Sequence, residues 1–304
     1  MLSPISAFSR LIVTGNDRIR YLHNFCTNNI KELRSGNACE AFFCDVKARV
    51  LAHGYVLAFD DCHEVWMLAG DEPGVLKHLN RYIITEDVTI RSDTQSASAF
   101  AVIGSTSVQA FLNGIEDSGE RLQQPLTCIR LQLHRPDGCA STITALSVTW
   151  DESPMLWLVT STNPSVISTE EGDSGTESEF ERLRIRERFP IINQDLSGEN
   201  MAPEAERNST AISYVKGCYL GQEPIARLDA MGHVNRTLQC LESTSSAASL
   251  AGATVLAADG TIAGVITSAA PVGDGSVGLA LIRSGAIHGP LHCVIDGQDV
   301  ELTV

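Results

Sequence analysis

Three Asp-Gly dipeptides divide the C-terminal part of the chain, residues 237–304, into short apolar segments. They stand at Asp259, Asp274 and Asp296, between runs of Val, Ile, Leu and Thr of strand length. An Asp-Gly pair favours the tight turn of a β-hairpin, because both residues tolerate the positive φ angles that such turns need. The segment therefore predicts a small all-β barrel or sandwich that begins at about Thr237.

The same segment contains the run Gly273-Asp-Gly-Ser-Val-Gly278, which formally matches the G-x-G-x-x-G pattern of dinucleotide-binding loops. That pattern works only where a crossover helix follows the loop and points its N-terminus at a pyrophosphate. Here Gly285 and Gly289-Pro290 follow too soon for such a helix. The run is therefore interpreted as a turn between strands, and no nucleotide site is predicted.

The N-terminal part, residues 1–236, mixes helical and strand patterns. Residues 16–33 carry apolar side chains at helical spacing, whereas residues 41–60 are apolar without a helical period and predict two strands joined near Lys47. Further segments are expected as strands at 64–68 and 87–91, as a helix at 73–81, and as a hairpin of 127–133 with 140–144 around Pro136-Asp137-Gly138. The pattern is that of an α+β region with two subdomains.

The charge balance limits the partners of the chain. Its 304 residues include 22 Lys and Arg against 37 Asp and Glu, a net charge of −15. Such an acidic surface argues against direct nucleic-acid binding. No export signal and no apolar membrane span is visible, so a cytoplasmic location without membrane contact is expected. Residues 165–181 hold six carboxylates and no basic partner, which predicts an exposed acidic loop.

The nine cysteines do not form a recognisable metal or disulfide pattern. No C-x-x-C pair occurs, so neither a zinc ribbon nor a cluster-binding motif can be identified. Two Cys-His neighbours, Cys62-His63 and His292-Cys293, lie in strand-like segments, where adjacent side chains point to opposite faces. No metal site is predicted.

The most informative stretch surrounds Cys218. Lys216 precedes it by two residues, and Gly221-Gln222-Glu223 has the form of a turn that opens a helix. A nearby ammonium group and a helix N-terminus both stabilise a thiolate, so Cys218 is a candidate reactive thiol; a buried structural cysteine is the alternative that local physics leaves open. Glu223 and Arg227 have the i, i+4 spacing of a helical ion pair.

The run Lys216-Gly-Cys-Tyr-x-Gly-Gln-Glu223, with Ala226-Arg227 and Gly232-His-Val-Asn-Arg236, closely resembles the signature of the YgfZ-type folate-binding proteins. These are relatives of the glycine-cleavage T-protein, an aminomethyltransferase, and act in iron–sulfur cluster assembly or repair. The resemblance extends to segments 13–15, 21–22, 27–29, 185–190, 203–205 and 264–268. It implies a T-protein-like folate-binding α+β fold of antiparallel sheets with helices around a central cavity (1–236), plus a C-terminal β-barrel (237–304).

Two departures from the transferases bear on the activity. The family pattern of the transferases has an Asp-Asp pair where this chain has Ala52-His53, and it lacks the cysteine that stands here as Cys218. Histidine can shuttle a proton but supplies no negative charge beside a developing iminium ion. The resemblance therefore favours an accessory protein; the alternative is a folate-dependent aminomethyl or methyl transferase that recruits His53 or Asp45.

The resemblance also implies folate-contacting residues. In the transferases a glutamate of the R-L-E-A-G-x-P run binds the pterin; here the aligned residue is Arg186, with Glu187 one position later. Phe8 and Phe180 stand where aromatic walls are expected, although two ordinary core phenylalanines would look the same. The full set of expected cofactor-binding residues is Phe8, Phe180, Arg186, Glu187, Tyr219, Gln222, Glu223 and Arg227.

The resulting prediction is a tetrahydrofolate-binding accessory protein in iron–sulfur cluster assembly or repair. Cys218 is the expected functional thiol, and Lys216 sets its environment. The expected partners are a folate and iron–sulfur client proteins such as radical-SAM tRNA-modifying enzymes, with no direct nucleic-acid contact. Two rival hypotheses are a binding module in which Cys218 merely packs, and a thiol redox sensor without folate.

Overall fold

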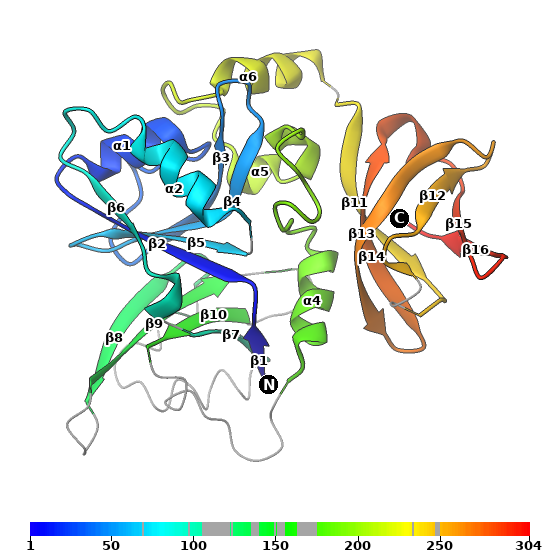
Figure 1. The fold of residues 1–304 in the computed structure, drawn as a ribbon, viewed down its shortest axis with the longest axis horizontal. Coiled ribbons are helices and arrows are strands. Elements are labelled where there is room, and N and C mark those ends of the chain that lie inside the picture. Colours follow the sequence, from blue (N-terminus) through cyan, green and yellow to red (C-terminus); the bar gives the residue numbers. More distant parts are fainter. Residues whose placement is uncertain are drawn as a thin grey trace.

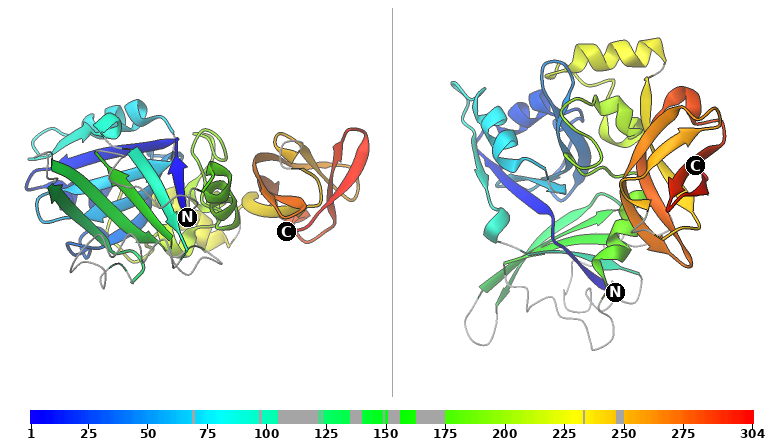
Figure 2. Two further views of the ribbon diagram at one scale, coloured as in Figure 1. Left: turned by 90° about the horizontal axis from the view of Figure 1, so that it is seen from below. Right: turned by 45° about the vertical axis from the view of Figure 1, so that its right-hand side comes forward.

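The computed structural model describes residues 1–304 except 69, 97, 105–121, 123, 135–139, 149, 151–155, 163–174, 233 and 247–249. The fold is α+β, and its strands form three antiparallel sheets (Figure 1). Two of the sheets belong to the N-terminal part, and the third forms the C-terminal half-barrel. Figure 2 shows the half-barrel standing beside the two stacked sheets, with the helix of residues 177–186 between them and the helix of residues 222–231 across the top in the right view.

Each N-terminal sheet has five strands, in the orders β1-β7-β10-β9-β8 and β3-β4-β5-β2-β6. The strands of the first are β1 (Leu2–Ile5), β7 (Ser98–Ile103), β8 (Cys128–His134), β9 (Ala140–Val148) and β10 (Leu156–Ser161). Those of the second are β2 (Phe8–Thr14), β3 (Ala38–Cys44), β4 (Val50–Ala58), β5 (His63–Leu68) and β6 (Thr89–Ser92). The sheets pack face to face, because Tyr55 and Trp66 of the second share one buried cluster with Ala101 and Leu158 of the first.

The helices occupy the outer face and one side of this sandwich. Helices α1 (Arg18–Phe25) and α2 (Glu72–Asn80) cover the outer face of the second sheet, where Leu22 and Leu79 are fully buried. The other helical segments are α4 (Glu177–Arg186), α5 (Asn208–Ala211), α6 (Gln222–Met231) and the short turns η1 (Thr94–Ser96), η4 (Ala202–Ala205) and η5 (Ser284–Ala286). The expected helix at 16–33 is thus shorter than its apolar pattern, since α1 ends at Phe25.

The C-terminal sheet has six strands in the order β11-β14-β13-β12-β15-β16. They are β11 (Arg236–Ser243), β12 (Thr254–Ala257), β13 (Ile262–Val272), β14 (Gly275–Arg283), β15 (Leu291–Ile295) and β16 (Gln298–Leu302). Asp259-Gly260 and Asp296-Gly297 lie at hairpin turns, and at Asp296-Gly297 both φ angles are positive, 51° and 78°. The turn between β13 and β14 is formed by Gly273-Asp274 instead, since Gly275 already begins β14 opposite Val272. The edge strands meet through one bridge, Glu242 with Thr303, so the expected barrel is a half-barrel.

The expected acidic loop at 165–181 is wrong at its C-terminal end. Residues 177–181 belong to α4, which begins with a capping box of Thr176 and Glu179. Carboxylates in a first helical turn interact favourably with the helix dipole, so the acidic run starts a helix there. Residues 165–174 of that prediction, and the Pro136-Asp137-Gly138 turn, lie outside the described residues. In the part of the chain that the structure describes, no helix is long and apolar enough to cross a membrane.

A buried arginine ties α4 to the half-barrel. The Arg184 guanidinium is fully buried and binds Asp195 at 2.7 Å, Ser268 Oγ at 2.8 Å and the Phe189 carbonyl at 2.8 Å. Asp195 also accepts a hydrogen bond from Thr267 of β13. Because these groups are satisfied only when the two parts are docked, the contact fixes the half-barrel against the N-terminal sheets.

Candidate functional site

Cys218 lies at an exposed position in the loop between α5 and α6. Among the eight cysteines that the structure describes, it is the one that is exposed; the others are buried or half-buried. Its neighbour Gly217 has open space on its side-chain side, and Val215 is 95% exposed. The loop therefore presents Cys218 to solvent, which excludes the buried structural cysteine; that Cys218 is a reactive thiol stays a prediction.

The loop is held at both ends by backbone contacts. The Ser213 N–H donates to the Thr27 carbonyl and the Leu220 N–H to the Asn24 carbonyl, each at 2.9 Å. Gly221 follows with φ of 83°, and a Cβ there would lie 2.7 Å from the Asp45 carbonyl oxygen. Only glycine fits this position, so the loop docks closely on the turn between β3 and β4.

Lys216 lies beneath the loop and is 6% exposed. Its ammonium donates to three carbonyl oxygens at the end of α1, those of His23 at 2.5 Å, Cys26 at 2.7 Å and Asn28 at 2.7 Å. Burial lowers its pKa. These carbonyls carry the partial negative charge of the helix C-terminus, so the lysine anchors the loop to α1. A direct contact with Cys218 is not among those described, and an influence of Lys216 on the sulfur stays a prediction.

The remaining residues of the motif lie on and under α6. Gly221 precedes the helix, which begins at Gln222 as expected. Glu223 and Arg227 form the expected i, i+4 ion pair at 3.4 Å on the exposed face. Tyr219 is buried, and its ring centre lies 4.8 Å from the Lys216 nitrogen. The structure thus places Glu223 and Arg227 in solvent and Tyr219 in the packing that supports the loop.

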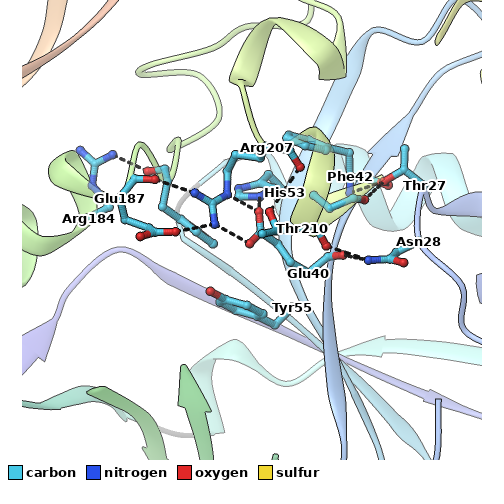
Figure 3. A network of polar contacts seen from close by, with 12 residues as sticks. Thr27, Asn28, Glu40, Phe42, His53, Tyr55, Arg184, Glu187, Arg207 and Thr210 are labelled. Atoms are coloured by element: carbon cyan, nitrogen blue, oxygen red, sulfur yellow. Dashed lines mark hydrogen bonds and ion pairs between the residues drawn. The ribbon is translucent and has the colours of Figure 1, made fainter. Parts of the chain in front are cut away.

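A second group of polar residues lies buried where β3 and β4 meet the segment after α4 (Figure 3). Glu40 of β3 accepts a bidentate pair of bonds from Arg207, one of them at 2.7 Å, and a bond from His53 Nε2 at 2.7 Å. The His53 ring stacks on Phe42 with a centroid distance of 4.4 Å, and the tilted ring of Phe189 lies 4.2 Å away. We call Glu40, His53, Arg207 and Glu187 the central array.

The protonation states of the central array follow from its contacts. Burial raises the pKa of Glu40, but the bonds from Arg207 and His53 outweigh it and bring the pKa down to about 2. Burial lowers the pKa of His53, against the opposing effect of Glu40. Glu40 is therefore ionised and His53 neutral at neutral pH. Since a carboxylate only accepts hydrogen bonds, His53 Nε2 carries its proton toward Glu40.

Glu187 and Arg186 point to different places. Arg207 donates to the Glu187 carbonyl at 2.6 Å and to Glu187 Oε1 at 3.0 Å, which orients this carboxylate at the edge of the central array. Arg186 instead reaches Glu242 of the half-barrel at 3.5 Å. Of the two candidates for the pterin contact, the structure brings Glu187 to the central array and turns Arg186 toward the other domain.

Phe8 and Phe180 belong to one aromatic cluster beside the central array. Phe8 packs edge-on against Trp66 at 5.5 Å, and Phe180, which is 1% exposed, packs against Trp150 at 5.7 Å. Trp150 donates a hydrogen bond to the Tyr55 hydroxyl at 2.9 Å. The sequence therefore identified two members of a larger aromatic group.

The two residues proposed to replace the transferase carboxylates have structural partners. His53 is 1% exposed and bound to Glu40. Asp45 Oδ1 accepts hydrogen bonds from the backbone N–H groups of Lys47 at 2.8 Å and Arg49 at 2.9 Å. Asp45 thereby closes the turn between β3 and β4, in the manner of other turn aspartates.

Sequence reasoning missed Glu40 and Arg207. A signal was present for Glu40, which is the lone charge in the otherwise apolar strand Ala38–Cys44. A charge in a buried strand needs a partner of opposite sign, but its identity depends on which distant segment packs there. Arg207 stands 167 residues further along the chain. For metals, no cluster of three or more ligand-type side chains occurs within the described residues.

No protein-family model matches the chain. Three relatives match most of it. The Arabidopsis thaliana chloroplastic protein At1g60990 is 31% identical over 93% of the chain, tRNA-modifying protein YgfZ of Colwellia psychrerythraea 24% over 80%, and mouse mitochondrial iron–sulfur cluster assembly factor IBA57 28% over 92%. The matches take in 65%, 71% and 76% of these proteins, so the chain spans less than two thirds of the Arabidopsis relative.

A solved structure shares the fold. The glycine cleavage system aminomethyltransferase T of Bartonella henselae superposes on 100% of this chain and 84% of its own, with a TM-score of 0.82. Sequence identity is 14%, so the likeness establishes the T-protein-like fold and carries no conclusion about activity.

Proposed function

The chain belongs to the family of YgfZ and IBA57, and from this premise we propose that it supports iron–sulfur cluster assembly or repair through Cys218 while binding a tetrahydrofolate-type ligand. The observation that carries the proposal is the exposure of Cys218 on a loop anchored by Lys216. An exposed thiol on a fixed loop can reach a partner protein, whereas a buried one cannot.

The loop gives the thiol a fixed position, and among the residues that the structure describes no cluster of metal ligands includes it. One cysteine supplies one ligand to an iron ion, so a cluster would need further ligands from a client protein. The role that fits is transient ligation of a client's cluster or disulfide exchange with it. Lys216 then acts as a positioning residue, since its three bonds to the end of α1 hold the loop. The acidic chain suits protein clients such as tRNA-modifying iron–sulfur enzymes better than tRNA itself.

The central array and its aromatic neighbours support the folate part of the proposal. A carboxylate is the acceptor that a pterin's adjacent N–H groups prefer, and Glu187 offers one, 17% exposed and oriented by Arg207. The half-buried Phe8 supplies aromatic surface nearby, and Phe180, which is 1% exposed, packs in the core cluster behind it. These residue types fit a pterin. When bound, tetrahydrofolate supplies a carrier of one-carbon units; this chain's residues would bind and orient it.

Substitution of Cys218 tests the thiol. In cells that lack the native gene, C218S is expected to lower the activity of iron–sulfur enzymes at least tenfold, at unchanged protein level. The control is C240S, which alters a half-buried cysteine of the half-barrel. Equal complementation by C218S and the wild type would contradict the proposal.

Calorimetric titration with tetrahydrofolate tests the ligand. E187Q is expected to weaken binding about tenfold, since one charge-assisted contact is lost. R186A serves as the control and is expected to bind as the wild type does. If the wild type shows no heat and no rise in melting temperature, the folate part fails. Formation of a one-carbon adduct of the folate during incubation with a methylene donor would favour the transferase alternative.

A further inference from the structure

Two arginines stand directly opposite each other at the edge of the half-barrel. Arg236 begins β11 and Arg283 ends β14, and the register of these antiparallel strands pairs them. Directly opposed residues project from the same face, with Cβ atoms about 4.5–5.5 Å apart. Like charges in this position repel, so the pair costs stability unless something binds between the two groups.

The charge environment makes the pair stand out. Arg283 is the only Lys or Arg in residues 237–304, a segment with six carboxylates, and the whole chain carries −15. Both side chains are exposed. Yet neither guanidinium forms an ion pair or a hydrogen bond with any of the described residues. Acidic side chains are plentiful, so the absence of a partner for both leaves two complete sets of donors.

Both arginines line a groove of about 380 Å³ between the half-barrel and residues 193–200. The volume lies within the range of small-molecule sites. Its walls combine polar groups with two exposed apolar side chains of β13, Ile262 (56% exposed) and Val265 (45% exposed). A ligand in this groove would contact the guanidinium groups of Arg236 and Arg283 and the apolar side chains of Ile262 and Val265.

One carboxylate, Asp195, also lines the groove, but its charge is already compensated. It is 3% exposed and binds Arg184 at 2.7 Å, the Thr267 hydroxyl at 2.7 Å and the Ile191 N–H at 2.8 Å. It therefore does not oppose an anion as a free carboxylate would.

We propose that this groove is a binding site for a small phosphate monoester with an apolar or aromatic body, held by Arg236 and Arg283. A phosphate monoester carries close to two negative charges at neutral pH and has three terminal oxygens, which satisfies two guanidinium forks at once. A single carboxylate has two oxygens, which suffice for a bidentate contact with only one guanidinium group. The apolar body lies against Ile262 and Val265. The site is separate from Cys218 and from the central array, and it does not depend on the proposed function.

Calorimetry of the full chain at low ionic strength tests the site, with phenyl phosphate as the probe. Inorganic phosphate and benzoate are the comparison ligands, since one lacks the apolar body and the other lacks the second charge. The variants are R236Q and R283Q, each of which removes one fork, and R283K, which keeps the charge without the fork. R34Q is the matched control, because Arg34 is an exposed arginine of the N-terminal part.

The expected order of affinity is phenyl phosphate above inorganic phosphate above benzoate. R236Q and R283Q are each expected to weaken phenyl phosphate binding at least tenfold, R283K less than R283Q, and R34Q less than twofold. Without ligand, R236Q and R283Q are expected to melt at or above the wild-type temperature, because the repulsion is gone; this also shows that they fold. Absence of binding by the wild type at millimolar phenyl phosphate, or equal affinity in R34Q and R283Q, overturns the proposal.

Discussion

The Cys218 loop and the central array each bury a cation, and they compensate it in different ways. Lys216 of the loop has three carbonyl oxygens around its ammonium and no carboxylate among its described partners. Arg207 of the array has the carboxylates of Glu40 and Glu187. Burial accordingly lowers the pKa of Lys216, whereas the carboxylates raise that of Arg207 against the effect of burial. Carbonyl dipoles hold Lys216 and thereby the loop, whereas the carboxylates of Glu40 and Glu187 hold Arg207 in the central array.

This difference assigns distinct tasks to the two regions. The central array joins strands of the second sheet to the segment after α4, so its bonds are part of the folded core. The loop is an attachment at the end of α1 that carries one exposed thiol. Damage to the array should therefore cost global stability, whereas damage to the loop should cost less stability and act on the thiol's position.

Loss of the carboxylate of Glu40 should have the largest effect. E40Q leaves Arg207 buried with only part of its charge compensated, and the expected loss of unfolding free energy is about 3–5 kcal/mol. Denaturant unfolding followed by circular dichroism measures it. The control is E223Q, since Glu223 is 88% exposed and its loss should cost less than about 0.5 kcal/mol. A loss below 1 kcal/mol in E40Q, about that of a surface pair, would contradict the role of the array.

Acid should remove the same stabilisation in the wild type. The pKa of Glu40 falls from its ordinary 4.5 to about 2 on folding, so the unfolded chain takes up its proton first as the pH drops. The contribution is complete above about pH 4.5 and is lost as the pH falls toward 2. Its size is about 3 kcal/mol, from about 1.4 kcal/mol per pKa unit. The measurement is unfolding free energy between pH 5 and 2, and the wild-type and E40Q curves should converge there.

Removal of the Lys216 ammonium should have the next largest effect on the free energy of unfolding. K216M leaves the carbonyls of His23, Cys26 and Asn28 without this donor, and the expected cost is about 2–3 kcal/mol. The reaction rate of Cys218 with an aromatic disulfide reagent shows whether Lys216 only holds the loop in place or also changes the reactivity of the Cys218 sulfur. The rate should stay the same or rise as the loop loosens. A tenfold slower reaction at unchanged stability would show instead that the lysine acts on the sulfur directly.

The exposed pair on α6 should matter least. Arg227 and Glu223 are 70% and 88% exposed, and R227A is expected to cost about 0.3 kcal/mol. Thermal unfolding at low and at high salt checks it, because screening should erase even this difference. A loss above about 1 kcal/mol would mean that Arg227 has a structural role that its contacts do not show.

Local patterns predicted the half-barrel and six of the N-terminal strands, but not β1, β2, β7 and β10. The Asp-Gly dipeptides at Asp259 and Asp296 lie at hairpin turns, because turn geometry depends on the φ preferences of two adjacent residues; at Asp274 the turn pair is Gly273-Asp274. The helix that opens after Gly221 and the two strands on either side of Lys47 follow for the same reason. The end of α1 at Phe25 and the start of α4 inside the expected acidic loop were not predicted, since the ends of a helix also depend on the segments that dock on it.

The sequence predicted one part of the candidate site, and the other part depends on tertiary contacts. The motif around Cys218 identified the thiol, but its exposure follows from how residues 213–221 dock on α1 and on the turn after β3. The same docking takes Lys216 under the loop. Arg186 and Glu187 are adjacent in the chain, yet one turns to the half-barrel and the other to the central array. Side-chain direction at a helix end is decided by the partners on each side.

The sequence by itself determined the strand-and-turn pattern of the half-barrel, the acidic charge and the motif that carries the thiol, because each depends on neighbouring residues or on composition. Tertiary structure alone decided which charges meet. Glu40 and Arg207 are 167 residues apart, and the opposed arginines 236 and 283 are brought together by strand register. Electrostatic interactions depend on distance in space and on burial, and neither can be read from separation along the chain.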